Sequence, residues 1–193
     1  MDQHFNYRNI AISSLPGAGR STLLANLKTI LQPLGWNFFS GGEWSRQYAI
    51  EHGLHDANNK VHHLATAYSD EVDLQIDKGM AEKLTKEDHY IVESWIAGFN
   101  MRNVPGVLKV LLLCDTALRI DRIVNRDSLG VEEAKEHMRQ RQETNVSKWK
   151  RMYAVDDFWD PKYYDVVIDT YSSGPMETLG KVLDKLGYKN HNK

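Results

Sequence analysis

The stretch IAISSLPGAGRSTLLANL, residues 10–27, carries the residue types of a phosphate-binding loop. An apolar run typical of a strand leads into a glycine-rich turn, and an amphipathic helical pattern follows. In such a turn, backbone N–H groups and the positive end of the following helix converge on phosphate oxygens, and Gly17 and Gly19 supply the permissive backbone. The predicted phosphate loop consists of Leu15, Pro16, Gly17, Ala18, Gly19, Arg20, Ser21 and Thr22.

Two positions depart from the pattern G-x-x-x-x-G-K-[ST], because Ser14 replaces the first glycine and Arg20 replaces the lysine. Replacing glycine by Ser14 costs little folding free energy if φ at this position is negative, and much if φ must be positive. Arg20 keeps a positive charge but spreads it over a planar guanidinium, so the charge cannot sit where an ammonium would without rearrangement. Ser21 and Thr22 still offer the hydroxyl that such loops use for Mg²⁺. An ordinary strand-to-helix turn without a ligand is the alternative.

Other charged residues could serve the same phosphate chemistry. Glu93 ends the apolar run YIVES, where a carboxylate needs water, a cation or an ion-pair partner. Arg122 and Arg126 lie four residues apart on a predicted helix, and an anion between them would relieve their repulsion. The neighbouring Asp121 and Asp127 could instead neutralise them at the surface.

Composition sets the outer limits for the function. The chain has 193 residues, 41% of them hydrophobic, which suits a single domain over residues 1–193. A net charge of -2 offers no overall attraction to nucleic acid or to an anionic membrane. A single cysteine excludes an internal disulfide, and no apolar run approaches the roughly 20 residues of a membrane span. We therefore expect a cytoplasmic protein, monomeric or weakly dimeric, without nucleic-acid or membrane partners.

Apolar runs alternate with helical patterns along the chain, which is typical of a parallel sheet with crossover helices. The predicted strands are 9–13, 36–40, 90–94, 108–114 and 165–170. The predicted helices are 20–31, 43–53, 59–85, 116–126, 131–154 and 175–186. Two segments, 41–88 and 127–164, are longer than a simple crossover requires and are candidates for moving parts.

An ordered series of motifs resembles the cytidylate kinase branch of the nucleoside monophosphate kinases. These motifs are PGAGRSTLLANL, SGGEWSRQYAIEHG, VESWIAGF, DTALRIDRIVNRD, EEAKEHMRQRQETNVSKWKRMYAVD and YDVVIDT, and they span nearly the whole chain. The resemblance implies an α/β, three-layer P-loop kinase fold with a five-stranded parallel sheet flanked by helices. It also implies a monophosphate-binding insert and a lid, which residues 41–88 and 127–164 match in position.

The resemblance further implies that the partners are small-molecule nucleotide substrates and that the cofactors are ATP and Mg²⁺. It also implies roles for individual residues. The residues that would neutralise charge during transfer are Arg20, Arg122, Arg126, Arg141 and Lys148. The Mg²⁺ geometry would depend on Ser21 and Glu93. The residues that would bind the acceptor are Gly42, Glu43, Arg46, Asp73, Trp95 and Gly98. A solvated arginine remains the alternative for Arg46, as does a solvated acidic face for Asp73 and Asp77.

Trp95 is the sharpest departure from the family. Cytidylate kinases resemble EGR where this chain has Glu93, Ser94 and Trp95. A tryptophan supplies no charge to a phosphate, although it can stack on a base or pack in the core. We expect ATP-dependent phosphoryl transfer to a nucleoside monophosphate, CMP or dCMP. The alternatives are a P-loop kinase with another small acceptor, and a nucleotide-binding regulatory protein with weak or no kinase activity.

Overall fold

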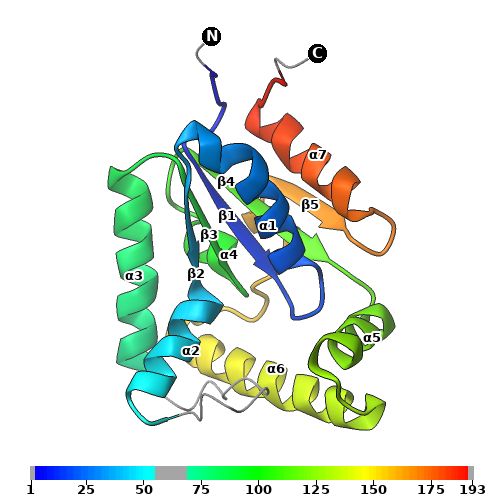
Figure 1. The fold of residues 1–193 in the computed structure, drawn as a ribbon. Helices are drawn as coiled ribbons and strands as arrows, with labels where there is room; N and C mark the ends of the chain where they lie inside the picture. The colour runs from blue at the N-terminus through cyan, green and yellow to red at the C-terminus, as the bar shows by residue number, and fades with distance from the viewer. Residues whose placement is uncertain (1–2, 55–68, 191–193) are drawn as a thin grey trace.

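The computed structural model describes residues 3–54 and 69–190. Its centre is an all-parallel sheet in the order β2-β3-β1-β4-β5 (Figure 1). The strands are β1 (Asn9–Ser14), β2 (Asn37–Ser40), β3 (Tyr90–Ser94), β4 (Val107–Leu113) and β5 (Val166–Asp169). The predicted α/β fold on five parallel strands is confirmed.

Helices cover both faces of this sheet. They are α1 (Arg20–Leu31), α2 (Gly41–Glu51), α3 (Asp70–Lys86), α4 (Ala97–Asn100), α5 (Thr116–Asp127), α6 (Val131–Tyr153) and α7 (Pro175–Leu186). Figure 1 shows α1 and α7 on one face, α4 on the other, and α6 crossing below the carboxyl ends of the strands. No helix in the described ranges is both long enough and apolar enough to cross a membrane.

Two apolar clusters hold the layers together. On the α1 and α7 face, Leu27 and Leu186 are fully buried against strand residues such as Ile10. On the opposite face, Leu84 of α3 and Met101, which follows α4, pack with Val92 and other strand residues. Burial of apolar area on both faces explains why the strands read as continuous apolar runs in the sequence.

A separate aromatic cluster attaches α6 to the sheet. Phe99 of α4 and Phe158 are fully buried and meet edge to face with ring centroids 5.0 Å apart. Trp149 of α6 contacts the same Phe158 ring, with centroids at 5.8 Å. Edge-to-face pairs add a directional attraction to the area that they bury. The carboxyl half of α6 is therefore anchored beside the end of β3.

The structure changes several predicted boundaries. Helix α2 begins at Gly41, two residues before the predicted start, because Ser40 caps it and accepts a hydrogen bond from the Glu43 N–H at 3.1 Å. Helix α3 begins at Asp70, and the earlier part of the predicted helix 59–85 falls largely outside the described residues. The single turn of α4 was not predicted, since four residues are too few to carry a helical period.

Candidate active site

The phosphate loop takes the backbone conformation that its glycines permit. Gly17 and Gly19 have φ of 81° and 95°, in the left-handed region. A Cβ on Gly17 would lie 2.7 Å from the carbonyl oxygen of Arg119, so the start of α5 touches the loop directly. The Arg119 Nε also donates to the Pro16 carbonyl at 2.8 Å. The loop is thus fixed against α5 and the amino end of α1.

Ser14 fits its position without backbone strain. Ser14 is the buried last residue of β1, and its φ is not positive. The position therefore does not demand a glycine, and the first departure from the loop pattern is harmless to the backbone. Ser14 lines the cavity, and its carbonyl accepts a hydrogen bond from Arg20.

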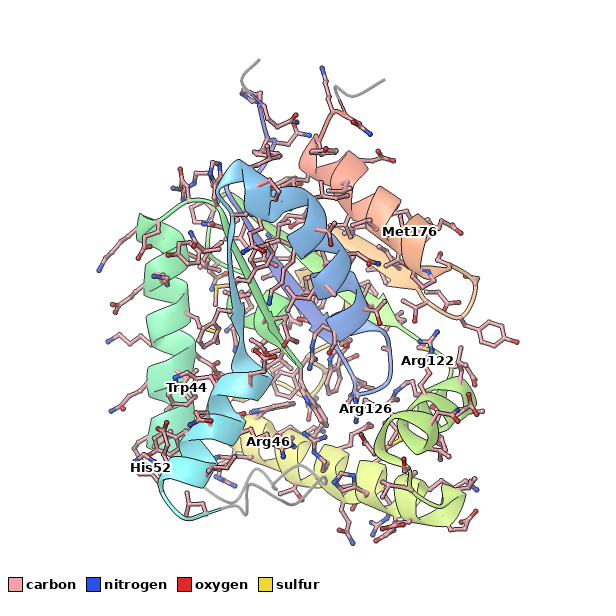
Figure 2. All side chains as sticks on the ribbon, viewed as in Figure 1. Trp44, Arg46, His52, Arg122, Arg126 and Met176 are labelled. Atoms are coloured by element: carbon pink, nitrogen blue, oxygen red, sulfur yellow. The ribbon has the colours of Figure 1, made fainter. Side chains whose placement is uncertain are left out.

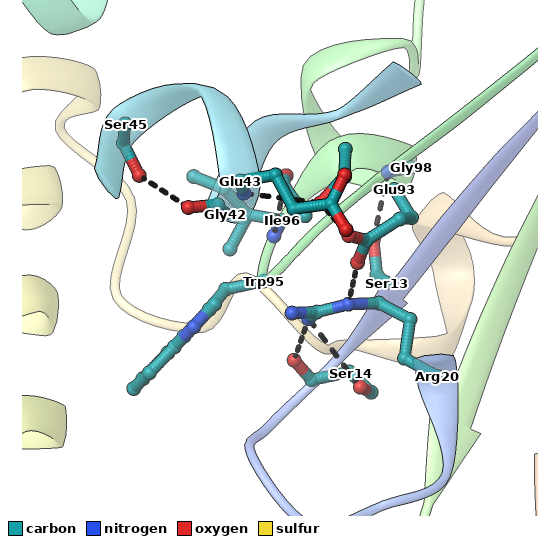
Figure 3. Close-up of polar contacts among 12 residues, drawn as sticks. Ser13, Ser14, Arg20, Gly42, Glu43, Ser45, Glu93, Trp95, Ile96 and Gly98 are labelled. Atoms are coloured by element: carbon teal, nitrogen blue, oxygen red, sulfur yellow. Dashed lines mark hydrogen bonds and ion pairs between the residues drawn. The ribbon is translucent and has the colours of Figure 1, made fainter. Parts of the chain in front are cut away.

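Arg20 turns back toward the sheet and pairs with Glu93 (Figure 3). Its Nε forms the ion pair, and its Nη1 donates to the Ser14 carbonyl at 2.9 Å. Glu93 is 4% exposed and also accepts a hydrogen bond from the Ser40 hydroxyl. The strand register places Ser40 opposite Glu93, so three elements meet at this point. Both carboxylate oxygens have partners, which meets the cost of burying the charge.

Arg122 and Arg126 project from α5 toward the loop (Figure 2). Arg122 donates to the carbonyls of Gly17 and Thr170, at 3.1 Å each, and so ties the loop to the end of β5. Arg126 makes two hydrogen bonds with the adjacent Asp127, at 2.7 and 2.6 Å, and this pairing raises the pKa of Arg126. The neutralising neighbour foreseen for Arg126 is thus present.

One cavity of about 750 Å³ joins the phosphate loop to α2, α3, α5, α6 and the end of β3. Most of the predicted site residues line it, drawn from segments far apart in the sequence. They are Leu15, Pro16, Gly17, Gly19, Arg20, Ser21, Thr22, Gly42, Glu43, Asp73, Glu93, Trp95, Arg122, Arg126 and Arg141. The structure therefore brings the predicted donor and acceptor sides together.

Four predicted residues lie outside the wall of this cavity. Ala18 is buried, and its carbonyl accepts from the Thr170 hydroxyl at 2.9 Å. Gly98 is buried in α4, where its N–H donates to Ser13 at 2.7 Å. Arg46 is half-buried on α2 beside the cavity-lining Ser45. The fourth residue, on α6, is engaged with α3 instead.

That residue is Lys148, whose Nζ lies 2.7 Å from Asp73 Oδ2. One turn further along α3, Asp77 accepts a hydrogen bond from the Tyr153 hydroxyl. Burial raises the pKa of Asp77 to about 6, and burial with the nearby carboxylate also raises the pKa of Tyr153. The polar face of α3 therefore holds the carboxyl half of α6 in place, beside the cavity.

Trp95 lines the cavity directly after the end of β3. The guanidinium of Arg141 lies over its ring at 5.1 Å from the centroid, within the range of a cation–π contact. Trp149 meets Trp95 edge to face at 5.7 Å. The Trp95 carbonyl accepts from Trp159 Nε1 at 3.0 Å, which fixes the backbone after β3. Trp95 therefore both lines the cavity and packs against the aromatic cluster, which confirms the packing expected of it, while stacking on a base stays a prediction.

Several residues that line the cavity have no role predicted from the sequence, notably Ser40, Asn145 and Trp149. A signal for Ser40 was available, because the spacing S-x-x-E from Ser40 to Glu43 is typical of a helix start after a strand. Nothing in the sequence indicated that the same hydroxyl would also reach Glu93 across the sheet. Trp149 occurs in a charged helix, and its aromatic partners come from other segments.

The residues present fit a Mg²⁺ ion bound mainly through a nucleotide. Mg²⁺ takes most of its ligands from water and phosphates in kinases, and the exposed Ser21 hydroxyl at the cavity is a suitable oxygen donor. Glu93 would first have to release Arg20 or Ser40. Within residues 3–54 and 69–190, no group of three or more His, Cys, Asp or Glu side chains is arranged to hold a metal by itself.

Comparison with known proteins identifies the family of the chain and its fold. The sequence profile of the cytidylate kinase-like family matches residues 36–172. A cytidylate kinase of Methanoregula boonei is 31% identical, over 90% of this chain and 91% of its own. One of Methanosarcina acetivorans is 30% identical, over 88% and 91%. A gluconokinase structure from Sinorhizobium meliloti has a TM-score of 0.57 at 14% identity, covering 93% of this chain and 91% of that one. The chain therefore belongs to the cytidylate kinase-like family and has the P-loop kinase fold.

Proposed function

We propose that the protein transfers the terminal phosphoryl group of ATP to a nucleoside monophosphate, with CMP and dCMP as acceptors. One observation carries the proposal: the phosphate loop and four of the six predicted acceptor residues, Gly42, Glu43, Asp73 and Trp95, border the same cavity of about 750 Å³. Phosphoryl transfer needs the two substrates in line at one site that excludes water, and it asks little covalent chemistry of the protein. The cytidylate kinases that resemble the chain over most of their length support these acceptors.

On the donor side, the loop backbone and the start of α1 would bind the phosphates of ATP. Arg122 and Arg126 reach the cavity from α5 and would neutralise the charge that spreads over the transferring group. The Ser21 hydroxyl would be an oxygen ligand for a Mg²⁺ ion that binds with the nucleotide, and the ion would supply further neutralising charge. Arg122 is already oriented by its hydrogen bonds to Gly17 and Thr170, which limits the reorganisation needed during the reaction.

On the acceptor side, Gly42 and Glu43 start α2 at the cavity, and Arg141 approaches from α6. The amino end of α2 would favour an anionic group, and the Arg141 guanidinium would pair with the acceptor phosphate. The Trp95 ring offers a surface on which a pyrimidine can stack. No general base is needed, because a phosphate monoester is already ionised near pH 7, with a second pKa of about 6.

A second acceptor class is favoured by one feature of the wall. Trp95 stands where the resemblance to cytidylate kinases implies an arginine, and the acidic Asp73 and Asp77 line the same cavity. Neutral hydroxyl groups hydrogen-bond well to carboxylates, whereas a phosphate is repelled by them. These residues support a small acceptor that carries hydroxyl groups and no phosphate.

A matched substrate panel separates the two classes. ADP release from ATP and Mg²⁺ would be measured with CMP, dCMP, UMP and AMP, and with cytidine as the phosphate-free counterpart of CMP. We expect turnover with CMP and dCMP and none with cytidine. Turnover with cytidine or another phosphate-free acceptor, and none with the monophosphates, would overturn the nucleoside monophosphate proposal in favour of the second class.

A third outcome tests whether the protein is an enzyme at all. If ATP binds but no acceptor is phosphorylated, the chain acts as a nucleotide-binding protein. The variant Arg20→Lys, which restores the usual loop residue, would then be expected to gain turnover. Robust turnover by the natural chain would reject this possibility.

A further inference from the structure

Arg20 uses two of its three guanidinium nitrogens inside the protein. Nε is ion-paired with Glu93, and Nη1 donates to the Ser14 carbonyl at 2.9 Å, with the Ser14 hydroxyl at 3.5 Å. Nη2 donates no hydrogen bond to any residue within the described ranges. The Arg20 side chain is 14% exposed where it lines the cavity. Nη2 is therefore the guanidinium nitrogen that remains available to a ligand (Figure 3).

A lysine at this position could not hold the same contacts. Its ammonium is a single point of charge, whereas the planar guanidinium presents donors in several fixed directions. The replacement of lysine by arginine in the loop thus allows one side chain to hold Glu93 and Ser14 and still face the phosphate path. The two departures from the loop pattern, Ser14 and Arg20, are in contact with each other.

The surroundings of Glu93 favour a lasting pair with Arg20. The carboxylate is 4% exposed, and its other oxygen is held by the Ser40 hydroxyl. Removing Arg20 from it would leave a buried carboxylate without a counter-charge, which is costly in a medium of low dielectric constant. A nucleotide can accept a hydrogen bond from Nη2 while the ion pair between Arg20 and Glu93 stays intact, so the Glu93 carboxylate keeps its counter-charge.

We propose that the Arg20–Glu93 pair stays closed when a nucleoside polyphosphate binds, and that Arg20 Nη2 donates to a phosphate oxygen. This deepens the proposed function, on which it rests for the nature of the ligand. Arg20 is then a residue that touches substrate and positions Glu93 at the same time. Glu93 serves as the partner of Arg20 and does not hold Mg²⁺ through water. Of the two residues predicted to bind the metal, Ser21 and Glu93, only Ser21 then remains for that role.

The Nε–H proton of Arg20 reports directly on the pair. Protein labelled with ¹⁵N-arginine would be studied by NMR without nucleotide, with ADP, and with ADP and Mg²⁺, and the Arg20 signal would be assigned by its loss in Arg20→Lys. An ion-paired, buried Nε–H exchanges slowly with water. We expect the Arg20 signal to remain protected in all three states. Its loss to exchange on adding ADP and Mg²⁺ would overturn the proposal.

A substitution of the partner gives a second, independent readout. Glu93→Gln keeps the shape and removes the charge, and we expect at least a tenfold faster exchange of the Arg20 Nε–H. Arg119 is the matched control, because its Nε donates to the Pro16 carbonyl at 2.8 Å and should keep its exchange rate. An unchanged exchange rate of the Arg20 Nε–H in folded Glu93→Gln would show that the ion pair does not protect this proton and would overturn the proposal. If this variant does not fold, the measurements on the natural chain decide alone.

Nucleotide binding, measured by calorimetry on the same samples, separates this inference from the proposed function. If ADP and ATP fail to bind with or without Mg²⁺, the proposed function and the inference fail together. If they bind while the Arg20 Nε–H signal is lost, only the inference fails. Binding with the signal retained, and at least tenfold weaker binding to Arg20→Met, supports the inference.

Discussion

Lys148 and Asp73 form an ion pair between α6 and α3, with the Lys148 Nζ 2.7 Å from the Asp73 Oδ2. The side chain of Lys148 is 5% exposed and that of Asp73 is 15% exposed, so water screens the pair weakly. The resemblance to cytidylate kinases implied that Lys148 faces the phosphates together with Arg141. In the structure Arg141 lines the cavity, whereas Lys148 fastens α6 to α3. The catalytic role of Lys148 remains a prediction that mutation can test.

Lys148→Met should destabilise the protein by about 3 kcal/mol, because it leaves the buried Asp73 carboxylate without its counter-charge. The free energy of unfolding would be measured by urea titration near pH 7. Adding Asp73→Asn to Lys148→Met should recover at least about half of that loss, since both charges are then absent. Losses that simply add in the double variant would contradict the coupling.

The same variant separates a structural role from a catalytic one. At a temperature where Lys148→Met is fully folded, we expect kcat at saturating substrates to stay within about tenfold of the natural chain. A fall of more than about 100-fold in the folded variant would return Lys148 to the charge-neutralising role implied by the resemblance. Circular dichroism at the assay temperature is the control for folding.

Asp77 should make the stability fall as the pH rises. Burial raises its pKa to about 6 from an ordinary value of 3.8, so the folded state binds the proton more tightly than the unfolded state. By linkage, this group contributes most to the free energy of unfolding below about pH 4, and the contribution is lost between about pH 4 and about pH 6. The expected loss over this window is about 3 kcal/mol.

Asp77→Asn isolates this effect from the other carboxylates. The amide cannot titrate, yet its oxygen can still accept the hydrogen bond from the Tyr153 hydroxyl. Urea unfolding across the acid range should show that the natural chain loses stability relative to Asp77→Asn as the pH rises. Parallel stability curves for the two proteins would show that Asp77 does not titrate in this window.

The fold was largely predictable from the sequence because its three central strands, β1, β3 and β4, are largely buried. Continuous apolar runs such as YIVES and VLLLC give a strong signal that does not depend on distant contacts. Helix α7 begins at Pro175, as the sequence indicates, because proline fits the first helical turn. The short α4 gave no such signal, since its place is set by Phe99 packing against Phe158 and Tyr163.

The candidate site was predictable where a residue acts through local geometry, and unpredictable where its partner is distant in the sequence. Gly17 and Gly19 were assigned from the loop pattern alone, and their left-handed conformation agrees with it. The partner of Lys148 lies 75 positions earlier in the chain, on another helix. Periodicity in the sequence predicts on which face of its helix a side chain lies. It does not predict which side chain of another element will contact it there.

Gly17→Ala should destabilise the loop by about 3 kcal/mol, since it combines a left-handed backbone with a clash. The added Cβ would come 2.7 Å from the Arg119 carbonyl oxygen. Gly19→Ala is the matched control, because its φ is 95° while the nearest atom, an Arg122 nitrogen, is 3.9 Å from a Cβ. We expect a loss of about 1 kcal/mol for Gly19→Ala. Equal losses in urea titrations would contradict the role given to the Arg119 contact.

Trp95→Ala should raise the KM for the acceptor by about tenfold and leave the KM for ATP within about twofold. The ring lines the cavity, where it contacts Arg141 and Trp149 of α6. Loss of the ring removes a stacking surface and the cation–π contact that orients Arg141. Steady-state kinetics with each substrate varied in turn would measure both constants.

Two further variants show which property of Trp95 matters. Trp95→Phe keeps an aromatic face and should recover most of the acceptor affinity if the ring stacks on a base. Trp44→Ala is the control for removing a tryptophan, because Trp44 is 36% exposed on α2 and does not line the cavity. If Trp95→Ala instead raises the two KM values equally, the ring acts by holding the end of β3 in the aromatic cluster, and the acceptor contact must be sought on α2 and α6.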